Sequence, residues 1–294
     1  MANLKGGNFE KQIKDAFHRL ESFGVTRIGK NDNLTHSDKL AQKRNMYLKD
    51  LANYFTSQNL EGKLNTHLTK DNIDKFFNER FETLSIKSQE NYIRGISSMF
   101  KGLFDQNIYI PIHYEDTAFF DDRVKAIKDQ AETIIENRYI DNVDLVIQNL
   151  YENRAITGLI AQCQYDLSIR QEEAFELVSN PLKYIENGYI ENLIGKGNHI
   201  YEPKEISFEL EQKLLNNQDE LISKSTYYYD LQKISSDISS HGISSHDFRF
   251  TSARDKFEEK MKSGISEKEA KLQISKTLNH KRIAISEYYL KRTE

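Results

Sequence analysis

Apolar residues recur at helical spacing through the first 110 residues of the chain. The pattern predicts one helix over 9–23 and a second over 39–57. Hydroxyl side chains at helix starts can accept hydrogen bonds from the N–H groups of the first turn. The residues placed to cap the second, third and fourth helices in this way are Thr35 or Ser37, Thr69 and Ser85. This part of the chain is therefore predicted to be a compact helical bundle.

The helical pattern breaks over residues 106–120, around Pro111, and resumes afterwards. A linker is predicted at 111–120, between a helical domain at 1–110 and a second domain at 121–294. Helices in the second domain are predicted over 122–137, 142–151, 156–165 and 171–178, and again from Ser207 to the end.

Residues 184–206 have a different pattern, because β-branched and aromatic residues alternate there around Asn187-Gly188 and Gly195–Asn198. Such turns favour a small antiparallel hairpin or a three-stranded sheet. The predicted fold class is mainly α with a small antiparallel β-sheet.

Composition adds little to this picture. Of the 294 residues, 38% are apolar and 29% are charged, which is ordinary for a globular protein. The longest apolar runs are too short to span a membrane, and the N-terminus lacks an apolar signal region, so a cytoplasmic location is expected. Cys163 is the only cysteine, which excludes an internal disulfide and a cysteine-based zinc site. It is expected to be a buried small residue.

The net charge of −4 neither excludes nor supports nucleic-acid binding, because binding follows local patches. Residues 1–110 hold 17 Lys and Arg against 13 Asp and Glu, a balance of +4. The remainder holds 24 against 32, a balance of −8.

Short motifs in the second half carry residue types suited to phosphoryl transfer to a tyrosine without a metal. They are Leu167-Ser-Ile-Arg170-Gln-Glu-Glu173, Gly195-Lys196-Gly-Asn198, His246-Asp-Phe-Arg249 and Leu278-Asn-His280, followed nine residues later by Tyr289. Each motif alone is a weak signal. Their joint occurrence in this order, with the lysine on a β-turn and the rest on helices, is a strong one.

In this set of motifs the chain resembles the tyrosine recombinase (phage integrase) family. The resemblance covers most of the chain: the catalytic domain motif by motif, and more loosely an N-terminal core-binding domain. Three departures stand out. Ser168 and Asn279 replace residues that are usually glycine, and His199-Ile200 follows the lysine turn where Lys and Arg are common. Only five residues follow Tyr289, so a tail that docks on a neighbouring subunit is not expected.

The resemblance implies a site-specific recombinase that cuts and rejoins DNA through a Holliday junction, with no cofactor, metal or ATP. Arg170 and Arg249 are expected to clamp the non-bridging oxygens of the scissile phosphate, because guanidiniums form planar, charge-assisted hydrogen bonds. Lys196 is the expected general acid. The family pattern implies a base-like role for His246 and a phosphate hydrogen bond for His280. Tyr289 would form a covalent 3′-phosphotyrosine.

Other interpretations of these residues remain open. Tyr288 competes with Tyr289 as nucleophile, and the Tyr289 assignment expects Tyr288 to pack in the core. Tyr227–Tyr229 could stack on bases or, as is more common, pack. The catalytic candidates could instead be structural: an ion-pair cluster at Arg170, a solvated turn residue at Lys196, or core or capping histidines. His199 and His241 fall outside the motifs and are interpreted as loop residues.

Two other functions compete with the leading one. A type IB topoisomerase-like enzyme would relax DNA as a monomer, and a catalytically inactive relative would only bind DNA.

The expected partner is double-stranded DNA carrying inverted-repeat core sites. The protein is expected to be a homotetramer on two DNA sites, a monomer when free, and assisted by accessory proteins, with no membrane partner. Abundant Lys, Asn and Ile loosely suggest a bacterial or phage mobile element. Phosphate contacts are expected from helix-borne polar side chains of the N-terminal domain, each of which could equally belong to an ordinary solvated helix face. These are Lys43, Arg44, Lys49, Lys87, Asn91 and Arg94.

Overall fold

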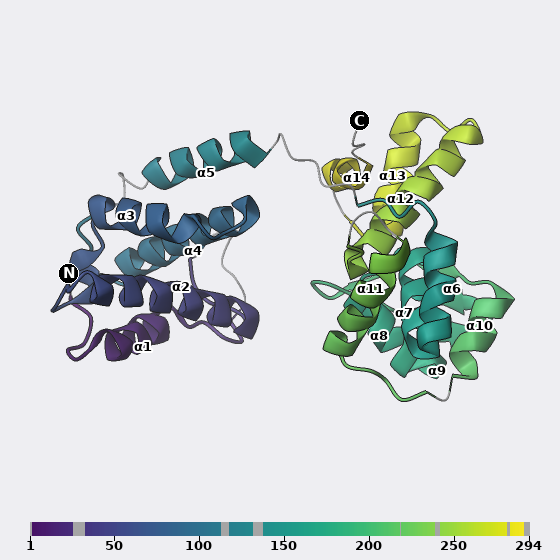
Figure 1. Cartoon of the computed structure of the whole chain (residues 1–294), viewed down its shortest axis with the longest axis horizontal. Coiled ribbons are helices and arrows are strands. Elements are labelled where there is room, and N and C mark those ends of the chain that lie inside the picture. The colour runs from purple at the N-terminus through teal and green to yellow at the C-terminus, as the bar shows by residue number, and fades with distance from the viewer. Residues whose placement is uncertain are drawn as a thin grey trace. The chain divides into compact units, whose positions relative to one another are not determined.

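The computed structural model describes residues 2–25, 33–112, 118–131, 138–217, 219–238, 242–280 and 283–290. The chain divides into two compact units, Met1–Ile135 and Glu136–Glu294 (Figure 1). Each unit is built around its own cluster of buried apolar side chains.

The N-terminal unit is built from helices. They are α1 (Phe9–Leu20), α2 (Asp38–Ser57), a 3-10 turn (Leu64–His67), α3 (Lys70–Phe81), α4 (Ile86–Asp105) and α5 (Ala118–Ala131). Ser37, Thr69 and Ser85 cap α2, α3 and α4, and each side chain accepts a hydrogen bond from the N–H three residues on. The predicted caps are therefore confirmed, with Ser37 rather than Thr35 at the start of α2. The first helix is shorter than predicted and ends at Leu20.

Helices α1, α2 and α4 pack together, and α5 covers α4. Helices α2 and α4 approach closely at Gly95, where an added Cβ would lie 2.2 Å from Cε2 of Tyr47. Phe120, Val124 and Ile127 of α5 join the core of the N-terminal unit. The apolar face of α5 thus places the boundary after this helix, whereas the sequence pattern assigns residues from 121 onward to the second domain. The end of the predicted helix, 132–137, lies outside the described residues.

The C-terminal unit begins with α6 (Val143–Asn153), α7 (Ala155–Asp166), α8 (Gln171–Ser179) and the short α9 (Pro181–Tyr184), and continues with α10 (Phe208–Leu215), α11 (Lys224–Ile238), α12 (Ser245–Lys262), α13 (Glu267–Thr277) and α14 (Ile283–Leu290). Helix α7 is apolar on most sides because it packs against α6, α8 and α12 at once. Its Cys163 is fully buried, as predicted, and this burial raises the pKa of the thiol. Within the described residues, each helix is too short or too polar to cross a lipid bilayer.

Residues 185–205 form two small antiparallel sheets. Strands β1 (Ile185–Glu186), β2 (Tyr189–Ile190) and β5 (Lys204–Glu205) pair in that order, and β3 (Ile194–Gly195) pairs with β4 (His199–Ile200). The turn from β1 to β2 uses Asn187 and Gly188, both with positive φ, as an Asn-Gly hairpin requires. The predicted fold class, mainly α with a small antiparallel sheet component, is confirmed.

Candidate active site

Arg170 stands at the N-cap of α8, where the backbone is extended before the helix begins. Glu173, one turn later, accepts from the Arg170 backbone N–H at 2.6 Å and from its Nη1 at 3.0 Å. Burial opposes the guanidinium charge, but the neighbouring Glu173 carboxylate and Tyr201 outweigh it, so the pKa of Arg170 lies above its ordinary value. One carboxylate therefore both starts the helix and holds its arginine charged.

Arg249 lies one turn after His246 on α12, so both side chains leave the same face of the helix. The Arg249 side chain is fully buried. It donates from Nη1 to the Tyr201 hydroxyl at 3.1 Å and from Nη2 to the carbonyl of Leu278 at 2.5 Å. Its Nε has no hydrogen-bond partner among the described residues. A fully buried donor without a hydrogen bond is costly to a fold.

His280 follows α13 and brings the two arginines together. Its Nε2 lies 3.4 Å from Nη2 of Arg170 and 3.5 Å from Nη2 of Arg249. Since guanidinium nitrogens can only donate, Nε2 must accept and the ring proton belongs on Nδ1. Burial, followed by the charges of Arg249 and Arg170, lowers the pKa of His280 to about 4.

Tyr289 of α14 completes the cluster. Its hydroxyl lies 3.1 Å from Nε2 of His246, and its ring lies 5.7 Å from the Arg249 guanidinium. Burial, followed by Arg249 and other nearby charges, lowers the pKa of His246 to about 4, so this imidazole is neutral at pH 7 and can accept a proton. Tyr289 is 5% exposed whereas Tyr288 is 50% exposed. The expectation that Tyr288 packs in the core is therefore wrong: the apolar cluster of Phe250 and Leu278 holds Tyr289 instead.

Lys196 lies on the turn from β3 to β4, and its side chain is exposed. Its backbone N–H donates to Oε1 of Glu173 at 3.3 Å. Gly197 and Asn198 complete the turn with positive φ values of 81° and 59°. The structure thus brings five of the six predicted side chains into mutual contact. It connects the sixth to them through its backbone.

Two departures from the family pattern have a conformational explanation. Ser168 and Asn279, which stand where glycine is usual, have φ values of 54° and 51°. Glycine adopts this left-handed region without strain, and Asn tolerates it better than most residues. Ser168 is fully buried, and its hydroxyl contacts that of Ser252 at 2.6 Å. The backbone turns that glycine would serve are thus formed here by other residues.

Tyr201 belongs to the cluster but lies in none of the predicted motifs. Its hydroxyl donates to Oε2 of Glu173 at 2.6 Å and accepts from both guanidiniums. Burial is the largest cause that raises its pKa, to about 12. A tyrosine five residues after the turn lysine belongs to no recognisable motif, so the sequence carried no signal for it.

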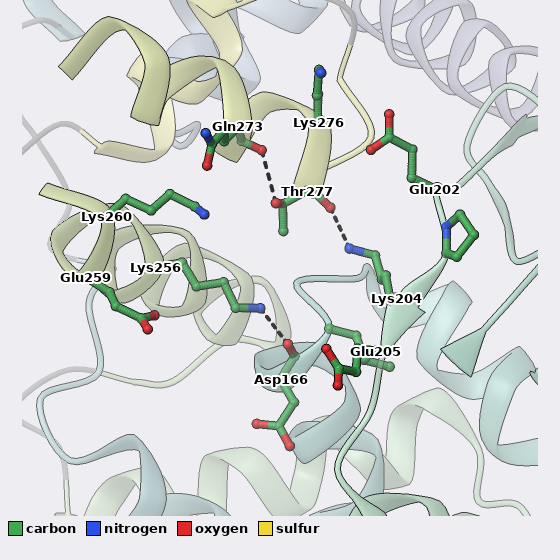
Figure 2. A pocket seen from close by; sticks show the side chains of 12 residues that line it. Asp166, Glu202, Lys204, Glu205, Lys256, Glu259, Lys260, Gln273, Lys276 and Thr277 are labelled. Carbon is green, nitrogen blue, oxygen red and sulfur yellow. Dashed lines mark hydrogen bonds between the residues drawn. The ribbon is translucent and has the colours of Figure 1, made fainter. Parts of the chain in front are cut away.

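A pocket of about 440 Å³ opens in the same unit between β5, α12 and α13. Figure 2 shows Lys204 and Lys256 extending into it, where Lys204 donates to the carbonyl of Thr277 at 2.8 Å and Lys256 to that of Asp166 at 2.5 Å. Burial is the main cause that lowers the pKa of Lys204 to about 7 and that of Lys256 to about 8. These two lysines were not predicted as special by any sequence pattern.

The candidate DNA contacts of the N-terminal unit divide into two groups. Lys43, Lys49, Lys87, Asn91 and Arg94 are exposed on α2 and α4. Among these, Lys87 and Arg94 both pair with Glu90, at 2.6 and 2.9 Å.

Arg44 differs from these five. It is only 2% exposed and donates to the hydroxyls of Thr35 and Ser98. Its assignment as a phosphate contact does not fit this burial, because the helical spacing of α2 turns it inward.

Other predicted features have mixed outcomes. Tyr227 is fully buried, as packing requires, but Tyr228 and Tyr229 are 46% and 69% exposed. His199 is exposed at the lysine hairpin, and His241 lies outside the described residues. In the described part of the chain, His, Cys, Asp and Glu side chains do not gather into a group of three or more that could hold a metal ion.

Comparison with known proteins gives a distant structural likeness. No protein-family model matches the chain, and no curated protein matches its sequence. Among solved structures, the chain is similar to one described as the crystal structure of XerA recombinase, with 12% identity, 88% of each chain covered and a TM-score of 0.39. At that identity and TM-score the likeness supports no inference about function. The function is therefore inferred from the geometry of the site.

Proposed function

We propose that this chain is a site-specific tyrosine recombinase, which cuts and rejoins DNA through a 3′-phosphotyrosine. One observation carries the proposal: a phenol, two imidazoles and two guanidiniums from separate motifs form one connected cluster. Hydrogen-bond contacts join Tyr289 to His246 and both guanidiniums to His280, and the Tyr289 ring lies 5.7 Å from the Arg249 guanidinium. Surface ion pairs or core histidines would not require Tyr289, His246 and Arg249 to meet in this way. The coarser statement, a protein that binds and acts on DNA, rests on the same cluster.

The two guanidiniums would bind the scissile phosphate. In the free protein the Nη2 atoms of Arg170 and Arg249 both face Nε2 of His280. A phosphate oxygen at this point would accept stronger, charge-assisted hydrogen bonds from both. The bound phosphorane would carry more negative charge than the diester, so donors fixed in place beforehand stabilise the transition state most.

His246 would accept the proton of the nucleophile. The oxygen of Tyr289 attacks phosphorus, a Tyr289–phosphate bond forms, and the tyrosine proton passes to Nε2 of His246. In the free protein its pKa of about 4 makes this imidazole a weak base. A bound phosphodiester would offset the charges of Arg249 and Arg170, which lower that pKa, so substrate would strengthen the base.

Lys196 would supply the proton of the leaving group. As the bond from phosphorus to the 5′ oxygen breaks, its ammonium gives a proton to that oxygen. Its exposed side chain stands on a turn whose backbone is tied to Glu173, the carboxylate that also binds Arg170. Attack by the 5′ hydroxyl of a second duplex would reverse these steps and exchange strands without ATP, within a tetramer on two paired sites.

Helices α2 and α4 would supply sequence-independent contacts to the DNA backbone. The exposed Lys43, Lys49 and Asn91 suit this role, and Lys87 and Arg94 would exchange Glu90 for phosphate. Arg44 is not part of this proposal. Four cationic contacts of this kind should weaken binding by about 10²-fold between 50 and 200 mM salt.

The test uses a library of nicked duplexes with randomised sequence, which trap a covalent adduct because the short strand beyond the cut diffuses away. The wild type is expected to form a DNA adduct that survives denaturation. Tyr289→Phe should abolish it, whereas Tyr288→Phe should leave it unchanged, since Tyr288 is exposed beside the cluster. An adduct lost in Tyr288→Phe instead would reassign the nucleophile.

The product distinguishes the competing functions. Circular substrates carrying two copies of a selected site are expected to yield recombinants. Relaxed circles alone would indicate a topoisomerase-like enzyme. Binding of the selected DNA with no adduct from wild type would indicate an inactive relative.

A further inference from the structure

Tyr201 immediately follows β4, and its hydroxyl is buried among three charged groups. The side chain is 4% exposed, and its backbone N–H donates to the carbonyl of Leu193 at 2.9 Å. The hydroxyl donates to Glu173 at 2.6 Å and accepts from Nη1 of Arg249 at 3.1 Å and Nη1 of Arg170 at 3.3 Å.

These three contacts use the whole hydrogen-bonding capacity of a phenol, one donor and two acceptor positions. Apolar packing alone would be met equally well by phenylalanine. The pKa of about 12 keeps the hydroxyl protonated at pH 7, so it can donate to the carboxylate while it accepts from both cations. The polar end of this side chain is therefore matched to the pair of arginines.

The position of the phenol decides which edge of each guanidinium faces the phosphate. Tyr201 and Glu173 hold Nη1 of Arg170, and Tyr201 holds Nη1 of Arg249. Nη2 of Arg170 is thereby left facing His280, and Nη2 of Arg249 faces both His280 and the carbonyl of Leu278. The Tyr201 oxygen thus bridges the two guanidiniums that would bind the same phosphate.

Tyr201 also connects the lysine turn to the arginines. An added Cβ on Gly195 would lie 2.9 Å from Cε2 of Tyr201 and 3.1 Å from Oε1 of Glu173. The absence of a side chain at Gly195 lets the start of the turn lie directly against this pair. A shift of the tyrosine would therefore move the turn of Lys196 together with the guanidiniums.

We propose that Tyr201 is a positioning residue, whose hydroxyl holds Arg170 and Arg249 at the spacing that one phosphodiester requires. The inference rests on the proposed function, because it concerns the phosphate that these arginines would bind. Tyr201 itself does not touch the reacting atoms; it acts through the guanidiniums.

Tyr201→Phe tests this inference, since it keeps the ring and removes only the oxygen. Adduct formation in a single turnover is expected to slow by about 10- to 100-fold, the scale of a lost hydrogen bond to a charged group. DNA affinity should remain within about twofold, because most phosphate contacts lie elsewhere. Tyr184→Phe is the matched control: Tyr184 is 3% exposed and donates to Glu176 at 2.7 Å, within the same unit. It should react at the wild-type rate.

A methylphosphonate at the cleavage position separates positioning from general damage. This substitution removes the charge that the guanidiniums would stabilise. If Tyr201 acts through the arginines, the rate loss of Tyr201→Phe should shrink to less than about threefold on this substrate, because its target charge is gone. An equal loss on both substrates, or no loss on the phosphodiester while wild type reacts, overturns the inference alone. A wild type that forms no adduct overturns the proposed function, and the inference with it.

Discussion

Arg44 of α2 and Arg249 of α12 are both buried arginines, with 2% and 0% of their surface exposed. Arg44 donates to the hydroxyls of Thr35 and Ser98 and joins parts of the N-terminal unit. Arg249 lies beside a second guanidinium, two imidazoles and a phenol, and its charge contributes to lowering the pKa of both His246 and His280. Burial of an arginine therefore does not by itself indicate function. What indicates function at Arg249 is the group of ionisable side chains that lies beside it.

The largest expected effect is on the rate of adduct formation, which should differ between variants of these two arginines. Arg249→Lys should slow adduct formation by about 10²–10³-fold, because lysine keeps the charge but lacks the planar, fixed pair of donors of a guanidinium. Arg44→Lys should leave the single-turnover rate on saturating DNA within about twofold, because its contacts lie inside the other unit. Equal losses for the two variants would contradict the distinction.

The control for the Arg249 and Arg44 variants is the free energy of unfolding, measured in urea. Arg44→Ala is expected to destabilise the protein by about 1–3 kcal/mol, since it leaves the buried hydroxyl of Thr35 and the partly buried hydroxyl of Ser98 without their charged donor. Arg254→Ala is a second control, on the same helix as Arg249 but paired with Glu258 on the partly exposed face. It should change the free energy of unfolding by less than about 1 kcal/mol and should not affect the rate.

Acid should destabilise the free protein through the two imidazoles that lie near Arg249. His246 and His280 have a pKa of about 4 in the fold, against about 6.5 when unfolded. Between pH 6.5 and 4 the unfolded chain binds more protons, so the free energy of unfolding falls as the pH falls through this window. His246→Gln should make that fall smaller, as measured by urea unfolding at pH 7 and pH 5.

The control for the acid effect is His18→Gln, which alters an exposed imidazole of the N-terminal unit, 82% exposed in its side chain. A change common to both variants would come from the loss of an imidazole in general and not from the surroundings of His246. If His246→Gln has as little effect as His18→Gln, then burial and the neighbouring arginines do not lower the pKa of His246.

An effect in the alkaline pH range should come from Lys204, whose pKa is about 7 in the fold and about 10.5 when unfolded. Between pH 7 and 10 the unfolded chain again binds more protons, so stability should rise with pH. Lys204→Met should flatten this rise, whereas Lys276→Met, on the exposed rim of the same pocket, should not. Identical slopes for both variants would show that Lys204 is not the group that titrates.

Much of the fold was predictable because its signals are local. Such signals depend only on residues a few positions away in the chain. They include the hydroxyl caps at Ser37, Thr69 and Ser85 and the turn at Asn187-Gly188. The place of α5 was not predictable in this way. The apolar face of α5 does not by itself say which unit the helix joins, and its packing against α4 decides this.

The same contrast holds in the candidate site. The resemblance of the motifs to the tyrosine recombinase family implied a cluster of five side chains, and these do meet: Arg170, His246, Arg249, His280 and Tyr289. The place of Tyr201 depends on contacts with Arg170 and Glu173, which are 31 and 28 residues away in the chain. Such contacts leave no periodic signal, because any residue type that fits the space can occupy it.

The most direct measurement of the central claim is peptide mass spectrometry of the trapped adduct. If the five side chains act on one phosphate, a nucleotide should be found on the peptide that contains Tyr289, attached through its phenol oxygen. The same digest should show Tyr288, Tyr201 and every other tyrosine unmodified. A nucleotide on any other side chain, or a wild-type protein that binds the selected DNA and never carries one, would contradict the account.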